Sequence, residues 1–409
     1  MATIAYLANI FPASVEPYVI EEIRELRKRG VSVIPCSARR TGPGLSQALK
    51  AWTGETISLE PLQFTLLLRA GWLCVWKIFR LKGFFLRALS QKTRTERRFR
   101  ALLNTLLGAY YALLLEKHQV KHIHVHHGYF GSWIAMVAAR LLDIPFSMTL
   151  HGSDLLIHAA YLDIKLKECQ FCVTVSEFNR RHILDVYPEA DPAKIFVRRM
   201  GVDCHVPASR PGSTKSEDSP LALLAVGRLH PVKDYVFLLR ACDLLKTRGL
   251  RFVCSIAGDG PERLSLEKLI CDLHLESDVQ LLGHLSRHQV DQQYESADVV
   301  VLTSRSEGIP LVLMEAMAHG KVVLAPAITG IPELVVDGTT GFLYQPGSLE
   351  DFIARVELIA NIRSALTPLR QAAREQVLRH FNREKNVTAF CDLLLSHLQA
   401  QPARFSIPA

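Results

Sequence analysis

The sequence predicts an α/β fold with two doubly wound domains, in each of which helices cover both faces of a parallel sheet. Three observations lead to this prediction. The chain has 409 residues, which is too long for one ordinary hydrophobic core. Short apolar runs alternate with stretches of helical periodicity, and this alternation occurs twice along the chain. A segment rich in proline, serine and charge separates the two series at residues 206–220.

The first domain is expected over residues 1–205. Its opening strand, "TIAYLANI", precedes a helix in which Val19, Ile23 and Leu26 share one face. Such alternation of apolar strands and amphipathic helices is typical of a parallel sheet that is covered on both sides. The further strand candidates of this domain are "VSVIPCS", "HIHVHH", "PFSMTLHG" and "FCVTVS".

The second domain is expected over residues 221–375, after the linker. Its strand candidates are "LALLAVGRL", "RFVCSIAGDG", "VQLLGHL", "DVVVLTS" and "VVLAPAI". Residues 376–409 are helical in pattern, and we expect these C-terminal helices to pack back on the first domain. Two such domains that face a central cleft would bind ligands at the carboxyl ends of their strands.

The composition places the chain among globular proteins, since 49% of its residues are hydrophobic and 22% are charged. The formal net charge of +8 favours an anionic partner, which a nucleic acid, a nucleotide or an acidic lipid would each satisfy. Cys169 and Cys172 form a single CxxC, so a zinc ribbon lacks its second pair, and Cys172 fits a plain strand residue better. Dispersed thiols and the absence of a signal-peptide pattern predict a cytoplasmic protein.

The most apolar region, residues 62–100, is also basic. Charges interrupt it too often for a membrane-spanning helix. Two interpretations remain: an interfacial surface that binds an anionic membrane, or helices packed on the domain with a solvated basic face. The charges that interrupt the region are Arg69, Lys77, Arg80, Lys82 and Arg87.

Two cations and three glycines follow predicted strands of the second domain. Gly227, Arg228 and Lys233 come where the first of these strands ends, and two cations at that edge suit a diphosphate. Solvated surface positions are the alternative for both cations. Gly258 lies either in a phosphate-binding glycine loop or in an ordinary strand-to-helix turn. Gly283 ends a third strand and offers backbone against which a base could lie.

The stretch "SRSEGIPLVLMEAMAHG" places two glutamates eight positions apart across the start of a predicted helix. Pro310 is typical of a helix start and Gly320 of a helix end. Glu307 would then lie in the preceding loop, and Glu315 on the helix within an apolar run. Free N–H groups at the helix start suit an anion, and Glu315 could accept hydrogen bonds from a ribose. The alternatives are a carboxylate that complements the helix dipole for Glu307 and a solvated helix position for Glu315, and nothing in the sequence makes the two a glycosidase pair.

Histidines mark the first domain. His151 ends the strand of "SMTLHGSD", with Asp154 three positions later, and could bind a substrate there. A satisfied structural histidine is the alternative. In "KHIHVHHG" strand alternation puts His122, His124 and His126 on one face. A zinc site would need a bend in that strand, because such side chains lie about 7 Å apart, so a structural role is favoured.

Taken together, these motifs resemble glycosyltransferase family 4, whose members are retaining, nucleotide-sugar-dependent enzymes with the GT-B fold. The matching pieces occur in the family's order and cover most of the chain from about residue 120 to 345. They are "HGSD", "GVD", "GRLHPVKD", "IAGDGPE", "LLGHLS", "SEGIPLVLMEAMAHG" and "GIPELVVDGTTGFLY". The stretches "FPASVEPYVIEEI" and "HVHHGYFGSW" are also similar to the bacterial exopolysaccharide and colanic-acid-type branch.

The resemblance implies catalytic roles for four residues. Arg228 and Lys233 would hold the donor's diphosphate and stabilise its developing charge as it leaves. Glu307 would contact hydroxyls of the donor sugar, and His151 would contact this sugar near the reacting carbon. Glu315 would bind the ribose. The other implied donor-binding residues are Gly308, Ile309, Pro310, Leu311, Gly258, Gly283 and Gly227.

The resemblance also implies a UDP- or GDP-sugar as co-substrate and no metal or other cofactor. The first domain would bind the acceptor, a glycan or a polyprenyl-diphosphate-linked glycan. A hydroxyl of this acceptor would attack the donor sugar on the same face from which the diphosphate leaves. Ser14 and Asp154 would lie near this acceptor. Many family members carry a glycine pair in the first loop, where this chain has Ser14 and Val15, so that loop departs from the pattern.

Two other functions stay open. A GT-B relative could hydrolyse or epimerise a nucleotide sugar, and a non-catalytic protein could merely bind one. The intact implied catalytic residues argue against the second. A nucleic-acid-binding protein would explain the charge but not the ordered motifs, so we expect no nucleic-acid partner. The expected location is the cytoplasm, at the inner face of the plasma membrane if residues 62–100 bind lipid.

Overall fold

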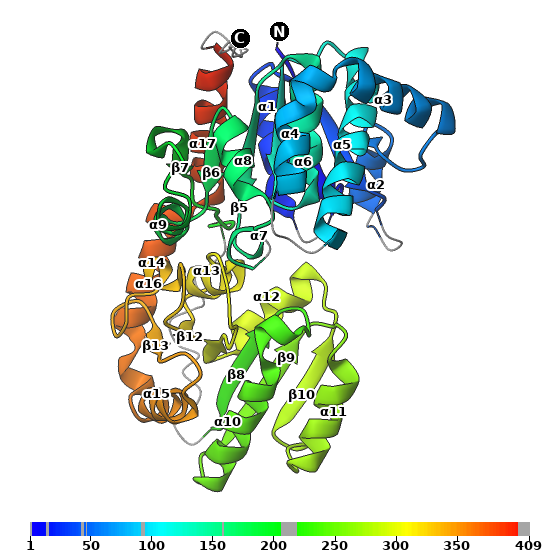
Figure 1. Cartoon of the computed structure of the whole chain (residues 1–409). Helices are drawn as coiled ribbons and strands as arrows, with labels where there is room; N and C mark the ends of the chain where they lie inside the picture. The colour runs from blue at the N-terminus through cyan, green and yellow to red at the C-terminus, as the bar shows by residue number, and fades with distance from the viewer. Residues whose placement is uncertain are drawn as a thin grey trace. The chain divides into compact units, whose positions relative to one another are not determined.

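The computed structural model of the chain describes residues 2–13, 16–41, 45, 47–90, 95–157, 159–205 and 219–399. Within them the chain forms two compact units, each with its own parallel sheet (Figure 1). Unit 1 comprises Met1–Val175, Asn179–Arg198 and Val387–Ala409, and unit 2 comprises Ser176–Phe178 and Arg199–Asn386. The prediction of two α/β domains with parallel sheets is therefore confirmed.

The sheet of unit 1 has seven parallel strands in the order β3-β2-β1-β4-β5-β6-β7. The order changes direction between β1 and β4, as in a doubly wound fold. Because helices cover both faces, β4 and β5 are buried along their whole length. The strands are β1 (Thr3–Ile10), β2 (Ser32–Arg39), β3 (Ile57–Ser58), β4 (His122–His126), β5 (Phe146–Leu150), β6 (Cys172–Thr174) and β7 (Ile195–Val197).

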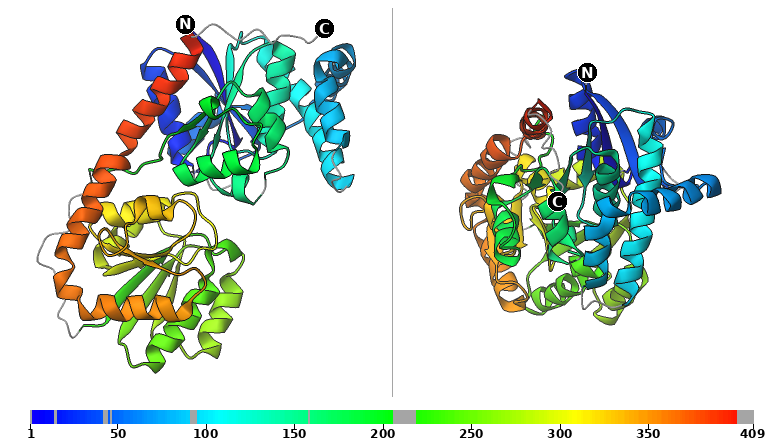
Figure 2. Two further views of the ribbon diagram at one scale, coloured as in Figure 1. Left: turned by 60° about the vertical axis from the view of Figure 1, so that its left-hand side comes forward. Right: turned by 45° about the horizontal axis from the view of Figure 1, so that its top comes forward.

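Helices pack on both faces of this sheet (Figures 1 and 2). Helix α1 and the C-terminal helix α17 share one core with β1, and α3 to α6 and α8 contribute to the core on the other face. The helices are α1 (Pro17–Lys28), α2 (Gln47–Thr53), α3 (Phe64–Trp76), α4 (Ile78–Ser90), α5 (Thr95–Glu116), α6 (Phe130–Leu142), α7 (Ser153–Leu156), α8 (Leu162–Glu168), α9 (Glu177–Val186) and α17 (Arg383–Gln399), with a 3₁₀ turn at Pro192–Lys194.

The sheet of unit 2 has six parallel strands in the order β10-β9-β8-β11-β12-β13, which changes direction between β8 and β11. The strands are β8 (Leu221–Val226), β9 (Phe252–Ala257), β10 (Val279–Gly283), β11 (Val299–Val301), β12 (Val322–Pro326) and β13 (Phe342–Tyr344). The helices are α10 (Tyr235–Thr247), α11 (Arg263–Asp272), α12 (Arg287–Ser296), α13 (Leu311–Ala318), α14 (Ile331–Leu334), α15 (Leu349–Asn361) and α16 (Thr367–His380), with 3₁₀ turns at Pro231–Lys233 and Arg363–Ala365.

The boundaries of the units differ from those expected at residues 205 and 375. Residues after Arg198 join unit 2 because Val202 N donates to Phe381 O at 2.9 Å and Arg383 N donates to Val202 O at 3.0 Å. Helix α16 also packs within unit 2, so the chain returns to unit 1 only at Val387. Of the expected linker, residues 206–218 lie outside the described residues.

Two smaller expectations are also met by local structure. Pro310 is the N-cap of α13, and Gly320 follows the helix in the left-handed region at φ +67°. Cys172 begins β6, as expected of a plain strand residue. Burial raises the pKa of the Cys169 thiol, the other cysteine of the CxxC, to about 12. Within the described ranges, no helix combines the length and the apolar character needed to cross a bilayer.

Candidate functional site

Three of the predicted glycines meet at the carboxyl ends of β8, β9 and β10 in unit 2. Gly258 N donates to Gly283 O at 2.8 Å, and Gly227 N donates to Ala257 O at 2.9 Å. A Cβ on Gly258 would lie 1.9 Å from Gly227 O, so no side chain fits there. Backbone rather than side chains therefore forms this edge of the sheet.

The loops that follow β8 and β11 join where the strand order of unit 2 changes direction. Lys233 Nζ lies 2.6 Å from Glu307 Oε1, and both side chains are largely buried. Thr303 Oγ1 donates to Lys233 O at 2.8 Å, and Arg305 N donates to Val232 O at 2.8 Å. This switch point is where doubly wound sheets bind ligands, so the fold brings Lys233 and Glu307 to the expected place.

The loop that leads into α13 keeps backbone N–H groups without internal partners. In the part of the chain that the structure describes, the amides of Gly308, Ile309 and Leu311 donate no hydrogen bond. Thr329 Oγ1 donates to Glu307 O at 2.6 Å and thereby fixes the loop. Unpaired amides at a helix start bind anions well, as the sequence predicts for this stretch. Arg228 is exposed and has no ion pair to any described residue.

Glu315 is not a solvated helix residue, because its side chain is only 15% exposed. Arg287 Nη1 donates to its Oε1 in a short ion pair, and Tyr294 OH donates to its Oε2 at 3.1 Å. A capping box of Ser286 and Gln289 begins α12 and so places Arg287 at its first position. Sequence reasoning missed Arg287 and Tyr294, because only the packing of α12 on α13 brings them to Glu315.

If Glu315 binds the donor, as the resemblance implies, replacing Arg287 with alanine should raise the donor KM about tenfold and leave kcat nearly unchanged, since Arg287 orients Glu315 for the ground state. Donor-dependent initial rates measure both constants. Arg248→Ala is the matched control, because Arg248 is a partly exposed arginine of the same unit that pairs with Glu350 and Glu357. Equal changes in both variants would contradict a role for Arg287 in orienting Glu315.

In unit 1 the loops after β1 and β4 also join at a switch point. His127 Nε2 lies 2.9 Å from Glu16 Oε1. Burial alone would lower the pKa of His127, but its hydrogen bond to Glu16 and the nearby Asp154 and Glu16 carboxylates raise it above the ordinary value. Glu16 and His127 lie in stretches that resemble the exopolysaccharide branch, but nothing in the sequence indicates that the two pair, so sequence reasoning missed this contact. Ser14, expected in the same loop, lies outside the described residues.

Asp154 has a different role from the one expected. It is fully buried, and its carboxylate accepts from the amides of Gly128 at 2.8 Å, Gly152 at 2.7 Å and His151 at 3.1 Å. A carboxylate with these partners fixes two loops and is not available to an acceptor. The expectation of acceptor contact is therefore replaced by a structural assignment, which the HGSD spacing alone could not distinguish.

His151 ends a chain of buried hydrogen bonds. Tyr6 OH donates to Glu22 Oε2 in a short bond, and His126 Nε2 lies 3.0 Å from the same oxygen. Since the tyrosine proton is used, His126 Nε2 must donate to the carboxylate. His126 Nδ1 lies 3.0 Å from His151 Nε2, so the two rings share a hydrogen bond. His151 Nδ1 is buried and has no partner among the described residues, so it remains for a ligand.

The histidine run is confirmed on one face of β4, and its members bind hydroxyl groups of the next strand. His122 Nε2 and His124 Nδ1 lie 2.7 and 2.8 Å from Ser147 Oγ, and His124 Nε2 lies 3.1 Å from Thr149 Oγ1. Burial lowers the pKa of His122 to about 3, so it stays neutral. Across the described ranges, no three His, Cys, Asp or Glu side chains are arranged to hold a metal ion.

A cavity of about 690 Å³ opens at the switch point of unit 1. Its wall includes Asn9 from β1, Glu16 from the loop that follows this strand, Arg39 from β2, and Asn104 from α5. Lys165 also lines it and donates to the carbonyls of Gly128, Tyr129 and Ala160 at 2.7 to 3.0 Å. Amide, carboxylate and guanidinium groups around one cavity can hydrogen-bond a polyhydroxylated ligand.

Comparison with known proteins agrees with this architecture. Residues 208–376 match the family described as glycosyl transferases group 1, and residues 15–206 match glycosyltransferase family 4. WcaL of Salmonella typhimurium, assigned to colanic acid biosynthesis as a glycosyltransferase, is 36% identical over 200 residues, which is 47% of this chain and 49% of WcaL. The amylovoran biosynthesis glycosyltransferase AmsK of Erwinia amylovora is 32% identical over 198 residues, 46% of this chain and 47% of AmsK.

These matches span about half the length of the curated relatives. Among solved structures, HepE of Anabaena in complex with UDP and glucose has a TM-score of 0.71 at 17% identity, covering 97% of this chain and 100% of HepE. Identity at this level establishes the fold alone. The GT-B fold expected from the sequence is confirmed, as is the resemblance to the family.

Proposed function

We propose that this chain, which belongs to the glycosyltransferases through a family 4 and a group 1 domain, acts in exopolysaccharide biosynthesis. In this proposal it transfers a sugar from a nucleotide-diphosphate sugar to an acceptor hydroxyl. The observation that carries the proposal is the Lys233–Glu307 pair at the switch point of unit 2. A cation and a carboxylate at that position suit the two ends of the donor, its diphosphate and its sugar.

The donor is assigned to unit 2. We propose that diphosphate oxygens replace Glu307 as the partner of Lys233, which frees the Glu307 carboxylate for the sugar hydroxyls. Arg228, exposed at the same strand end, and the amides of Gly308 and Ile309 would share the diphosphate charge. Glu315, already oriented by Arg287, would accept hydrogen bonds from the ribose.

The proposed reaction retains the configuration of the transferred sugar. The acceptor oxygen forms a bond to the anomeric carbon, the bond from that carbon to the diphosphate oxygen breaks, and the acceptor proton passes to the departing phosphate. Arg228, Lys233 and the loop amides stabilise the charge that develops on the leaving group, so the proposal needs no metal. His151 is assigned to the transferred sugar through its unpaired Nδ1.

The acceptor is assigned to unit 1, where the 690 Å³ cavity presents polar groups for a glycan. The acceptor class is a glycan or a polyprenyl-diphosphate-linked glycan, as the relatives' part in exopolysaccharide biosynthesis supports. UDP and glucose occupy the HepE structure, and this makes a uridine-diphosphate sugar the first donor to test.

The experiment follows a radiolabelled UDP- or GDP-sugar with and without lipid-linked glycans extracted from membranes. We expect transfer of the label only when acceptor is present. NMR of the product should show that the anomeric configuration of the transferred sugar is retained. Free labelled sugar formed equally without acceptor would instead identify a hydrolase. An altered sugar on the nucleotide would identify an epimerase, and binding without turnover a non-catalytic protein.

A further inference from the structure

We propose that a face of unit 1 formed by α3 and α4 docks on an anionic phospholipid bilayer. This surface, the α3–α4 face, is defined by the exposed side chains of Leu68, Trp72, Val75, Trp76 and Phe79. In Figures 1 and 2 helix α3 projects away from the strands of unit 1.

Exposed apolar side chains concentrate in this part of the chain. Of the twenty large apolar side chains that are exposed among the described residues, thirteen lie within residues 62–103. Trp72 is 63% exposed, Val75 71% and Phe79 88%. Single exposed apolar residues are common on soluble proteins, but a contiguous group of this kind marks a contact surface.

The two sides of α3 are both apolar. Phe64, Leu68, Trp72 and Val75 recur at helical spacing on the exposed side, whereas Ala70 and Leu73 are buried in the core of unit 1. One side is therefore satisfied by the fold, and the other has no cover from any described residue. A helix that is apolar all round needs a second non-aqueous contact.

The chain segment that carries the face has charges of one sign. Residues 61–95 contain seven lysines and arginines and no aspartate or glutamate. Some of these cations already have partners in the structure. Lys77 Nζ donates to Leu141 O at 2.9 Å, and Arg87 pairs with Asp163. Arg69 and Lys82 are exposed and have no ion pair with a described residue. Cations beside apolar side chains are complementary to anionic headgroups above acyl chains.

The aromatic side chains suit the same boundary. The rings of Trp72 and Trp76 stack with centroids 5.2 Å apart, and Lys77 Nζ lies 5.9 Å from the Trp76 ring. Tryptophan prefers the headgroup region of a bilayer, where its ring is apolar and its N–H can be hydrated.

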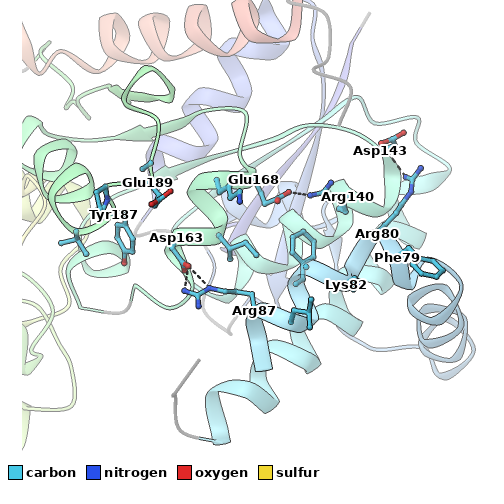
Figure 3. A pocket seen from close by; sticks show the side chains of 18 residues that line it. Phe79, Arg80, Lys82, Arg87, Arg140, Asp143, Asp163, Glu168, Tyr187 and Glu189 are labelled. Atoms are coloured by element: carbon cyan, nitrogen blue, oxygen red, sulfur yellow. Dashed lines mark hydrogen bonds and ion pairs between the residues drawn. The ribbon is translucent and has the colours of Figure 1, made fainter. Parts of the chain in front are cut away.

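A cavity of about 910 Å³ opens beside the face, as Figure 3 shows. Phe79, Arg80 and Lys82 from α4 line it. Its three arginines are already paired, Arg80 with Asp143, Arg87 with Asp163 and Arg140 with Glu168. Lys82 and Lys167 line it without an ion pair to a described residue and remain for a lipid phosphate that enters from the adjacent bilayer.

A second copy of the chain is the other conceivable occupant. A two-fold contact presents the same surface from both copies, and here it would bring cations toward cations without a carboxylate from residues 61–95 to separate them. The charge pattern thus favours an anionic bilayer over self-association.

The test is flotation of the full chain with vesicles of phosphatidylglycerol and phosphatidylcholine, compared with phosphatidylcholine alone. All four tryptophans lie in unit 1, and Trp52 and Trp133 are buried, so a blue shift on binding reports Trp72 and Trp76. One variant combines Trp72→Ser, Val75→Ser and Phe79→Ser, and another combines Arg69→Gln, Arg80→Gln and Lys82→Gln. The control combines Lys246→Gln, Lys268→Gln and Arg379→Gln, which are solvent-exposed cations of unit 2.

We expect the wild type to bind only vesicles that contain the anionic lipid, and its tryptophan fluorescence to shift to the blue on binding. The charge variant should lose roughly a hundredfold in affinity, whereas the control should lose none. The apolar variant should also lose binding while it keeps the thermal unfolding midpoint of the wild type. The absence of flotation, equal binding of the face variants and the control, or equal binding to neutral vesicles would overturn the proposal. A wild-type dimer in light scattering that becomes a monomer in the face variants would also overturn the proposal.

Discussion

Replacing Lys233 with alanine is expected to lower kcat/KM for sugar transfer about 10²- to 10³-fold. Lys233 ends the turn after β8, and its Nζ lies 2.6 Å from Glu307 Oε1. In the proposed reaction this ammonium group stabilises the negative charge that grows on the departing diphosphate. Its removal acts on the transition state more than on donor binding, so most of the loss should be in kcat.

The same substitution also leaves Glu307 without its partner, and the two effects must be separated. The double variant Lys233→Ala with Glu307→Gln removes the unpaired charge. If Lys233 only neutralised Glu307, the double variant would recover the activity of Glu307→Gln alone. The proposed role predicts no such recovery. Lys246→Ala, which removes a partly exposed cation paired with Asp278, is the control and should keep wild-type rates.

Replacing His126 with glutamine is expected to lower kcat about 10- to 100-fold and to move the acid limb of its pH profile upward. Burial, with the neighbouring His127, His126 and His124, holds the pKa of His151 well below its ordinary value. His151 is therefore neutral near pH 7 and stays so on acidification. Without the His126 imidazole the pKa of His151 rises, so His151 is protonated, and activity lost, at a higher pH than in the wild type.

His122→Gln is the matched control for this prediction. His122 lies on the same face of β4 and is equally buried, but its hydrogen bond goes to Ser147 and not to His151. A general loss of core packing would affect both variants alike. The prediction fails if the two lose the same activity, or if the acid limb of the His126 variant stays in place. The other titratable groups near His151 are Tyr18, His127 and Asp154.

The elements of the fold follow from local patterns, and so they could be predicted. Strands that are buried on both faces read as apolar runs, and their ends carry the residues that a doubly wound sheet places at its binding edge. Gly227, Gly258 and Gly283 were expected at three strand ends, and the structure joins them. The same rule placed Lys233 and Glu307 at the switch point.

Partners from distant elements could not be predicted, because they depend on strand order and helix packing. Tyr6, Glu22 and His126 meet only because β1 pairs with β4 and α1 covers that face. Arg287 reaches Glu315 only through the packing of α12 on α13. These contacts have no sequence period, so local pattern contains no signal for them.

Asp154 illustrates a second limit of sequence patterns. A carboxylate after a strand can face a ligand or bind backbone amides, and the sequence is the same in both cases. The histidine run was easier, since alternation alone puts its members on one face. Its hydroxyl partners follow from the register of β4 and β5, in which His124 is opposite Ser147 and His126 opposite Thr149.

The most direct test of a nucleotide-sugar site in unit 2 is a thermal-shift panel of UDP, GDP, ADP and their common sugar conjugates. The panel is run on the wild type, on Glu315→Ala and on Arg228→Ala. The predicted result is saturable stabilisation by one nucleotide class that is weaker in both variants. No stabilisation of the wild type by any nucleotide, or stabilisation that both variants retain in full, would contradict the assignment.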